Sequence, residues 1–144
     1  MKKIIFMLLF AAMMSNAANA QKISADKVPV AVSTAFKTKF PTAEKVKWEM
    51  ENTEYEANFK LNGEEVSANF DETGKWLETE TEMKVSDLPA AIQSTLKKYF
   101  AGFKVKEASK IESVKNGNGY EAEIEKGEET FDVLFSADGK VLSK

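Results

Sequence analysis

The chain has 144 residues, with 23 acidic residues against 20 lysines, and it contains no arginine, histidine or cysteine. Without histidine and cysteine it lacks most nucleophile–base pairs and the usual zinc and haem ligands, and we expect neither enzyme activity nor a cofactor. A mildly acidic chain without a basic cluster also lacks the footprint of a nucleic-acid-binding protein.

The first twenty residues have the organisation of a secretory signal peptide. Lys2 and Lys3 form a basic head, an apolar run follows over residues 4–14, and residues 18–20 read Ala-Asn-Ala, the small residues that a signal peptidase recognises. Eleven apolar residues in a helix span roughly 16 Å, about half of a ~30 Å hydrocarbon layer, which disfavours a membrane anchor. We expect cleavage after Ala20 and a periplasmic or secreted mature chain without membrane insertion.

Beyond residue 20 the sequence repeats itself. Three pairs of segments match: 28–40 with 88–100, 55–59 with 120–124, and 70–77 with 135–142. The first pair is 60 positions apart and the other two are 65 apart, so the extra residues fall in one connecting segment. We expect a single domain over residues 21–144, made of two tandem repeats at about 26–83 and 86–144.

Each repeat begins with a predicted amphipathic helix. Asp87 and Pro89 are typical of a helix start, and Pro41 and Gly102 are expected to end the two helices. Apolar residues recur at every fourth position, which places them on one side of a helix and favours core packing over a ligand pocket. These residues are Val28, Val32, Phe36 and Phe40 in the first repeat, and Leu88, Ile92, Leu96 and Phe100 in the second.

After each helix the apolar period changes to two residues. Alternation over 44–52, 54–61 and 65–70 predicts antiparallel strands with one buried side, which holds Trp48, Tyr55 and, in the second repeat, Tyr120, and one solvated side. An Asn-Gly pair and a Lys-Gly pair supply hairpin turns. The matching sequences FDETGKWL and FSADGKVL each contain a glycine turn between strands.

The segment that joins the repeats, residues 78–84, contains neither proline nor glycine, so we expect it to be a strand and not a flexible tether. The predicted fold class is α+β. The strands form one fused antiparallel sheet or two closely packed sheets, and both helices pack on one face.

These features resemble the PepSY-like, β-lactamase-inhibitor-like proteins exported by Bacteroidota. The resemblance rests on the signal peptide, the paired helices that follow a Val-Pro or Leu-Pro step, the Tyr-Glu-Ala strands and the F-x-x-x-G-K-x-L hairpins, and it covers nearly the whole mature chain. It implies a tandem unit of helix and antiparallel sheet. The β-lactamase inhibitor proteins bind an enzyme on the concave face of their sheet, and PepSY domains accompany or restrain peptidases, so the resemblance also implies protein binding.

The second repeat offers a candidate surface for a protein or peptide partner. Acidic side chains on neighbouring strands repel by about a few tenths of a kcal/mol each, which a basic partner would relieve. The alternative is an ordinary solvated face, where strand residues need only be polar. The candidate residues on the predicted exposed side are Glu121, Glu123, Glu125, Asp132 and Leu134.

Trp76 is a further candidate, because only one of the adjacent residues Trp76 and Leu77 can point inward. Trp76 either packs at the rim of the core or anchors a partner. Aromatic residues often anchor protein interfaces. Trp48, Tyr55 and Tyr120 are predicted on the buried side, which leaves them unable to contact a partner.

The predicted function is a non-catalytic exported binding module of the cell envelope that contacts a protein or peptide, as an inhibitor or regulator of an enzyme. The alternative is a structural or calcium-responsive periplasmic protein without a specific protein partner. Asp71, Glu72 and Asp138 lie in glycine turns, but each turn offers one or two ligands where a calcium loop needs five or six, so we expect no metal site. No pattern in the sequence indicates an oligomeric state.

Overall fold

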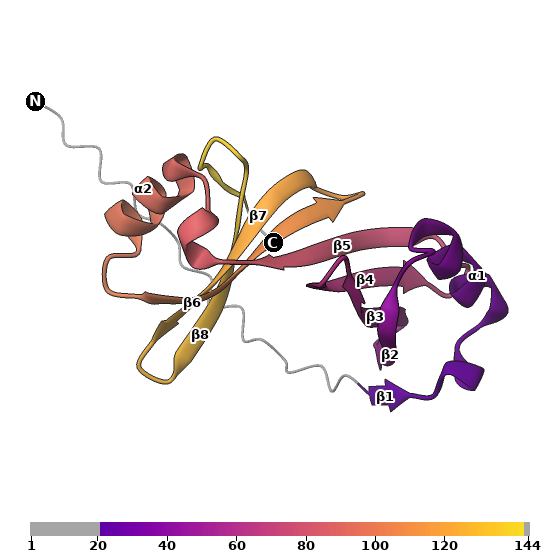
Figure 1. Ribbon diagram of the computed structural model, residues 1–144. Coiled ribbons are helices and arrows are strands. Elements are labelled where there is room, and N and C mark those ends of the chain that lie inside the picture. Colours follow the sequence, from indigo (N-terminus) through magenta and orange to yellow (C-terminus); the bar gives the residue numbers. More distant parts are fainter. Residues whose placement is uncertain (1–20, 143–144) are drawn as a thin grey trace, which may run out of the picture.

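The computed structural model describes residues 21–142, and Figure 1 shows their arrangement. The α-helices are α1 (Val30–Lys39) and α2 (Ala90–Tyr99), preceded by the 3₁₀-helices Ala25–Lys27 and Val85–Asp87. The strands are β1 (Gln21–Ile23), β2 (Glu44–Glu51), β3 (Glu54–Leu61), β4 (Glu64–Asp71), β5 (Trp76–Met83), β6 (Lys104–Ser113), β7 (Gly117–Lys126), β8 (Glu129–Phe135) and β9 (Val141–Leu142). The predicted signal peptide and its cleavage site lie outside the described residues.

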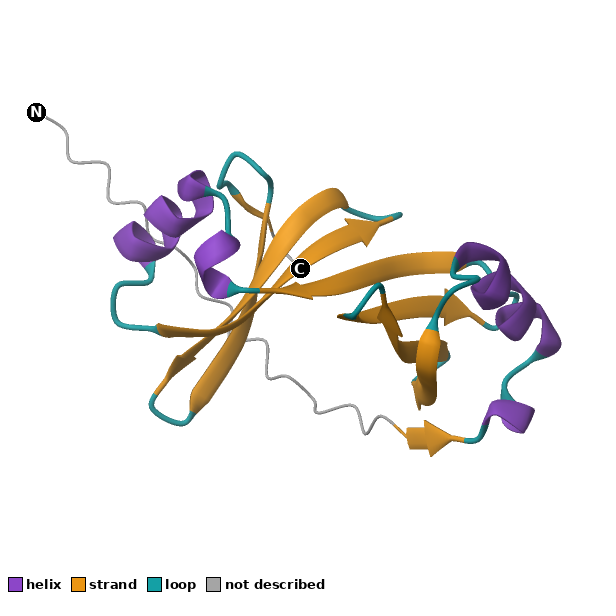
Figure 2. Ribbon diagram, viewed as in Figure 1, coloured by secondary structure: helices purple, strands orange, loops and turns teal. Residues whose placement is uncertain are grey.

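The described strands form one sheet of nine, in which every strand pairs antiparallel with the next one in the sequence. β5 and β6 join the two halves through a continuous ladder that runs from Glu78 opposite Ser113 to Met83 opposite Ala108. Of the two arrangements that the sequence allowed, the fused sheet is therefore the correct one. Figure 2 shows the helices α1 and α2 at opposite ends of this sheet.

Both helices begin directly after a proline. Pro29 and Pro89 precede the first helical residue, with ψ angles of 142° and 140°. Val28 and Leu88, which the four-residue period included in the helices, have non-helical backbone and are nevertheless buried. The residue before a proline is disfavoured in the helical region, so each helix starts two residues later than its apolar pattern.

Each helix contributes to its own hydrophobic core. Trp48 is 7% exposed, and Tyr55 and Tyr120 are half-buried against the cores, which confirms the predicted buried side of their strands. The first core consists of Val28, Val32, Phe36, Phe40, Trp48, Ala57, Phe59, Val66, Ala68 and Phe70. The second consists of Leu88, Ile92, Leu96, Ala108, Ala122, Ile124, Val133 and Phe135.

The two glycine turns that the sequence repeats, between β4 and β5 and between β8 and β9, contact the helices. Gly74 and Gly139 both have φ of +83°, a left-handed conformation that favours glycine. A Cβ atom on Gly74 would lie 2.6 Å from the carbonyl oxygen of Ala31, and one on Gly139 would lie 2.7 Å from that of Ala91. Each turn therefore presses its glycine against the first turn of the helix in its own half.

Candidate functional site

Three of the predicted site residues lie on β7, where alternate positions hold Glu121, Glu123 and Glu125. The ladder places Glu123 opposite Asp132 of β8 and, on its other side, opposite Glu107 of β6. We call Glu107, Glu123 and Asp132 the Glu123 row. Residues directly opposite in a ladder project to the same side of a sheet, so this row brings three carboxylates together across three strands.

The Glu123 row raises the cost of ionising its central residue. Partial burial is the largest cause that raises the pKa of Glu123 above its ordinary value, and the charges of Glu107 and Asp132 add to it. Lys106 opposes this shift, but its ammonium is committed to Glu125 at 3.2 Å. Lys106 therefore does not neutralise the negative charge of the three carboxylates in the row.

Sequence alternation did not identify Glu107. The register of β6 against β7 shifts between Val105 and Glu107, so an irregularity in the ladder brings Glu107 opposite Glu123. The sequence contains no glycine or proline in residues 104–113 to mark this shift. Only the strand pairing reveals it.

Leu134 differs from its prediction as an exposed residue. It is 3% exposed. Gly119, two positions before its partner Glu121 on β7, has no side chain to occupy the space beside Leu134. The Cδ1 atom of Leu134 lies 3.8 Å from the position that a Cβ on Gly119 would occupy. Leu142 of β9 stands opposite Leu134 on the other side. Leu134 is therefore a packing residue, because its side chain fills the space over a glycine.

Trp76 lies apart from the acidic residues. It pairs with the core residue Phe70 and is half-buried against the first core. Its indole Nε1–H donates a hydrogen bond to Thr79 Oγ1 at 2.8 Å, and Lys39 Nζ lies 4.0 Å from the centroid of its ring. Trp76 therefore packs at the rim of the first core, which is one of the two alternatives that the sequence left open. It does not lie on the side of the sheet that carries the Glu123 row.

A second acidic row lies in the first half of the sheet, and sequence reasoning missed it. We call it the Glu56 row, in which Glu49 stands opposite Glu56, flanked by Lys22 of β1 and Asn69 of β4. Burial raises the pKa of Glu56 above its ordinary value, and the charges of Glu49 and Glu51 raise it further. Both halves of the sheet thus contain a partly buried glutamate surrounded by other carboxylates.

The carboxylates of the glycine turns are used within the turns themselves. Asp71 Oδ1 accepts hydrogen bonds from the Thr73 hydroxyl and from the backbone N–H groups of Thr73 and Lys75. Ser136 donates to Asp138 in the second turn, and these bonds hold the pKa of both aspartates below the ordinary value. Within residues 21–142 no group of three or more potential ligands, the Glu123 row included, is arranged so that it could hold a metal ion. Neither helix of that part is long and apolar enough to cross a membrane.

A sequence model of one protein family matches this chain twice, over residues 13–67 and 59–143. That family is described as beta-lactamase-inhibitor-like and PepSY-like. A comparison with curated proteins finds no match. The two family segments together include both halves of the sheet and both helices.

Solved structures share this fold. A BLIP-like protein from Bacteroides fragilis is 28% identical, with a TM-score of 0.67 over 78% of this chain and 82% of that one. A DUF2874 family protein from Bacteroides uniformis is 23% identical, with a TM-score of 0.71 over 80% and 86% of the two chains. A protein from Bacteroides eggerthii is 22% identical, with a TM-score of 0.72 over 81% and 86%. Because the family match extends over most of the sequence, this chain belongs to the PepSY-like, beta-lactamase-inhibitor-like family.

Proposed function

We propose that the protein is a non-catalytic binding module of the bacterial periplasm, and that it holds a lysine- or arginine-rich segment of a partner protein on its acidic rows. The Glu123 row carries this proposal, because three carboxylates stand opposite one another on adjacent strands. Like charges in that arrangement destabilise a sheet. A cationic partner offsets this repulsion, so the same residues that weaken the free sheet strengthen the complex.

The two acidic rows act on the same uncovered side of the sheet in this proposal. The continuous ladder supports this. Ala68 of the first core is opposite Thr79 of β5, and Ala108 of the second core is opposite Met83 of β5. Thr79 and Met83 are four positions apart on one strand, so they project to the same side and place both cores on that side. Both helices then cover one face, and the two halves are tandem copies, in line with the double family match. The other face carries the acidic rows and is left for a partner there, while Leu134, opposite Glu121 on that face, is already buried.

The proposed location and partner class have support from the sequence and from relatives. The predicted signal peptide indicates export, and the relative from Bacteroides eggerthii is provisionally described as periplasmic. The relative from Bacteroides fragilis is described as BLIP-like, which supports a protein as the partner. Electrostatic complementarity of this kind chiefly sets specificity and association rate, so binding should weaken with salt.

The test is the binding of a labelled peptide of alternating lysine and serine to residues 21–144, measured by fluorescence anisotropy at low and physiological salt. The triple variant Glu107→Gln, Glu123→Gln, Asp132→Asn is expected to bind at least about tenfold more weakly than the wild type, because the central acidic row is lost. The same proteins are then used to capture partners from a periplasmic extract.

A matched control removes the same number and kind of carboxylates elsewhere. The variant Asp26→Asn, Glu64→Gln, Glu72→Gln changes three exposed residues outside the acidic rows and should keep most of the affinity. Equal losses in the two variants would show that only net charge matters and would reject the Glu123 row as a site. Captured proteins that do not respond to the row variant would favour the structural alternative.

A further inference from the structure

The second half of the molecule has an open pocket where the first half has a closed aromatic cluster. In the first half the ring centroids of Phe36 and Phe40 are 5.6 Å apart, and that of Phe59 lies 5.1 Å from Phe36 and 4.8 Å from Phe40. The repeat places Leu96 at the position of Phe36 and Ile124 at the position of Phe59. Two aromatic side chains are thus replaced by smaller aliphatic ones.

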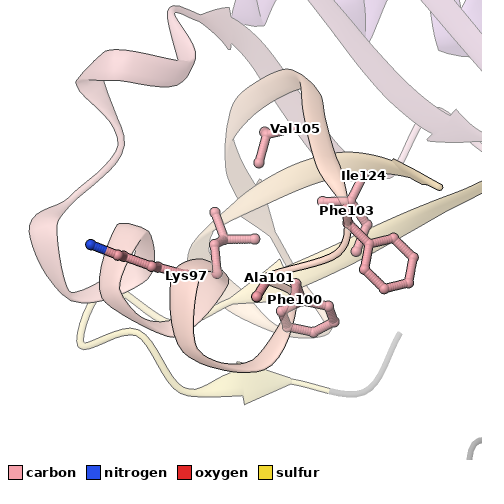
Figure 3. A pocket seen from close by; sticks show the side chains of 7 residues that line it. Lys97, Phe100, Ala101, Phe103, Val105 and Ile124 are labelled. Carbon is pink, nitrogen blue, oxygen red and sulfur yellow. The ribbon is translucent and has the colours of Figure 1, made fainter.

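The resulting pocket has a volume of about 470 Å³ and lies between the end of α2 and the start of β6. Figure 3 shows Val105 and the rings of Phe100 and Phe103 around the same space, while Lys97 extends away from the rings. A volume of this size is ordinary for a small-molecule site and is too small for a helix. The lining residues are Leu96, Lys97, Phe100, Ala101, Phe103, Val105 and Ile124.

The charges at this pocket differ from those on the rest of this acidic protein. No carboxylate lines it. Lys126 is not one of its lining residues, but the Lys126 ammonium lies over the ring of the lining residue Phe103, 5.4 Å from the ring centroid. Within residues 21–142 neither Lys97 nor Lys126 takes part in an ion pair, although Glu129 stands opposite Lys126 in the ladder. The pocket is therefore lined mainly by apolar side chains, and an ammonium without a carboxylate partner lies beside it, over Phe103.

We propose that this pocket binds a small anionic amphiphile, a molecule with an apolar chain or ring and one acidic group, and that Lys126 receives the acidic group. The apolar part is removed from water by Leu96, Phe100, Phe103 and Ile124. A neutral apolar molecule leaves the ammonium without a partner, and a cationic one is repelled by it. This site is independent of the acidic rows.

The test is an NMR titration of residues 21–144 with octanoate, and with octanol as the uncharged probe of the same chain length. Octanoate is expected to give saturable amide shifts in residues 96–105 and 124–126, and octanol to bind more weakly. Lys126→Met should weaken octanoate by about threefold, the range of an exposed ion pair, and leave octanol unchanged. Lys140→Met, at an exposed turn lysine, is the control and should change neither.

The repeat supplies the variant that closes the pocket. Leu96→Phe with Ile124→Phe gives the second half the residues of the first at these two positions and should weaken octanoate binding by at least about tenfold. The acidic rows stay intact, so this variant should bind the lysine–serine peptide normally, which separates the two proposals. If the double variant does not fold, the proposal is judged by which amides shift on addition of octanoate and by the effect of Lys126→Met on octanoate binding. The proposal would be overturned if octanoate gave no saturable shifts, or gave them outside these residues. It would also be overturned if the double variant bound octanoate as tightly as the wild type.

Discussion

At the scale of single residues, Glu123 links the stability of the sheet to its surface charge. Its carboxylate is flanked by Glu107 and Asp132 on both neighbouring strands, and burial together with these charges raises its pKa. A carboxyl whose pKa is higher in the folded than in the unfolded state favours folding only when it is protonated. Ionised Glu123 therefore lowers the free energy of unfolding at neutral pH.

Glu123→Gln should accordingly make the protein more stable at pH 7, by about a few tenths of a kcal/mol, because one member of a like-charge row is removed. The difference should shrink as the pH falls through the raised pKa of Glu123, since the wild-type residue then becomes neutral as well. Urea unfolding at pH 7 and near pH 4 measures both effects. Glu64→Gln, at an exposed position outside the row, is the control; a gain that is equal for both variants, or that persists near pH 4, contradicts this account.

At the scale of elements, the glycine turns fix where each helix lies on the sheet. Gly74 and Gly139 combine a positive φ with backbone contact to Ala31 and Ala91. The second half adds a hydrogen bond from Thr95 Oγ1 to the carbonyl of Gly139, at 2.8 Å. The repeated hairpin sequence is therefore a helix-docking element as well as a turn between strands.

Gly74→Ala should lower the free energy of unfolding by about 2–4 kcal/mol, because it adds a steric clash with α1 to the cost of a left-handed alanine. Gly63→Ala is the matched control, since Gly63 also has a positive φ of +90° but would meet no atom within 4 Å. It should cost only about 1 kcal/mol. Both are measured by chemical denaturation, and similar losses at the two sites would mean that contact with the helix contributes nothing.

Periodicity predicted elements well where the ladder is regular and poorly where it shifts. The helices and the buried side of β3 and β7 follow from the spacing of apolar residues. In β2, where the register shifts between Glu44 and Lys47, Trp48 is buried but Val46 is exposed. Glu107 was missed because an irregularity in β6 changes its register, and Trp76 was ambiguous because β4 and β5 shift between Asn69 and Phe70. The burial of Leu134 depends on Gly119, a neighbour fifteen positions away in the sequence. Such contacts are properties of strand pairing, which a single-sequence pattern does not contain.

At the scale of the whole molecule, two hydrophobic cores share one sheet. α1 and α2 lie at opposite ends of it (Figure 1). The β5–β6 ladder connects the two halves by hydrogen bonds, and the chain itself passes from β5 through Val85–Asp87 to α2. The buried residues of each core come from one half, although Met83 at the end of β5 packs against the second core. Whether the halves unfold together therefore depends on whether that ladder is strong enough to couple them.

The continuous ladder favours coupled unfolding, and the positions of the two tryptophans make this measurable. Trp48 and Trp76 both lie in the first half, so their fluorescence reports on the first core, whereas far-UV circular dichroism reports on the whole chain. Phe135→Ala removes a fully buried side chain from the second core and should cost about 3–5 kcal/mol. In a coupled molecule this variant lowers the urea midpoint of tryptophan fluorescence as much as that of circular dichroism. If the fluorescence midpoint stays at its wild-type value while the dichroism curve splits into two transitions, the two halves are independent folding units that merely share a sheet.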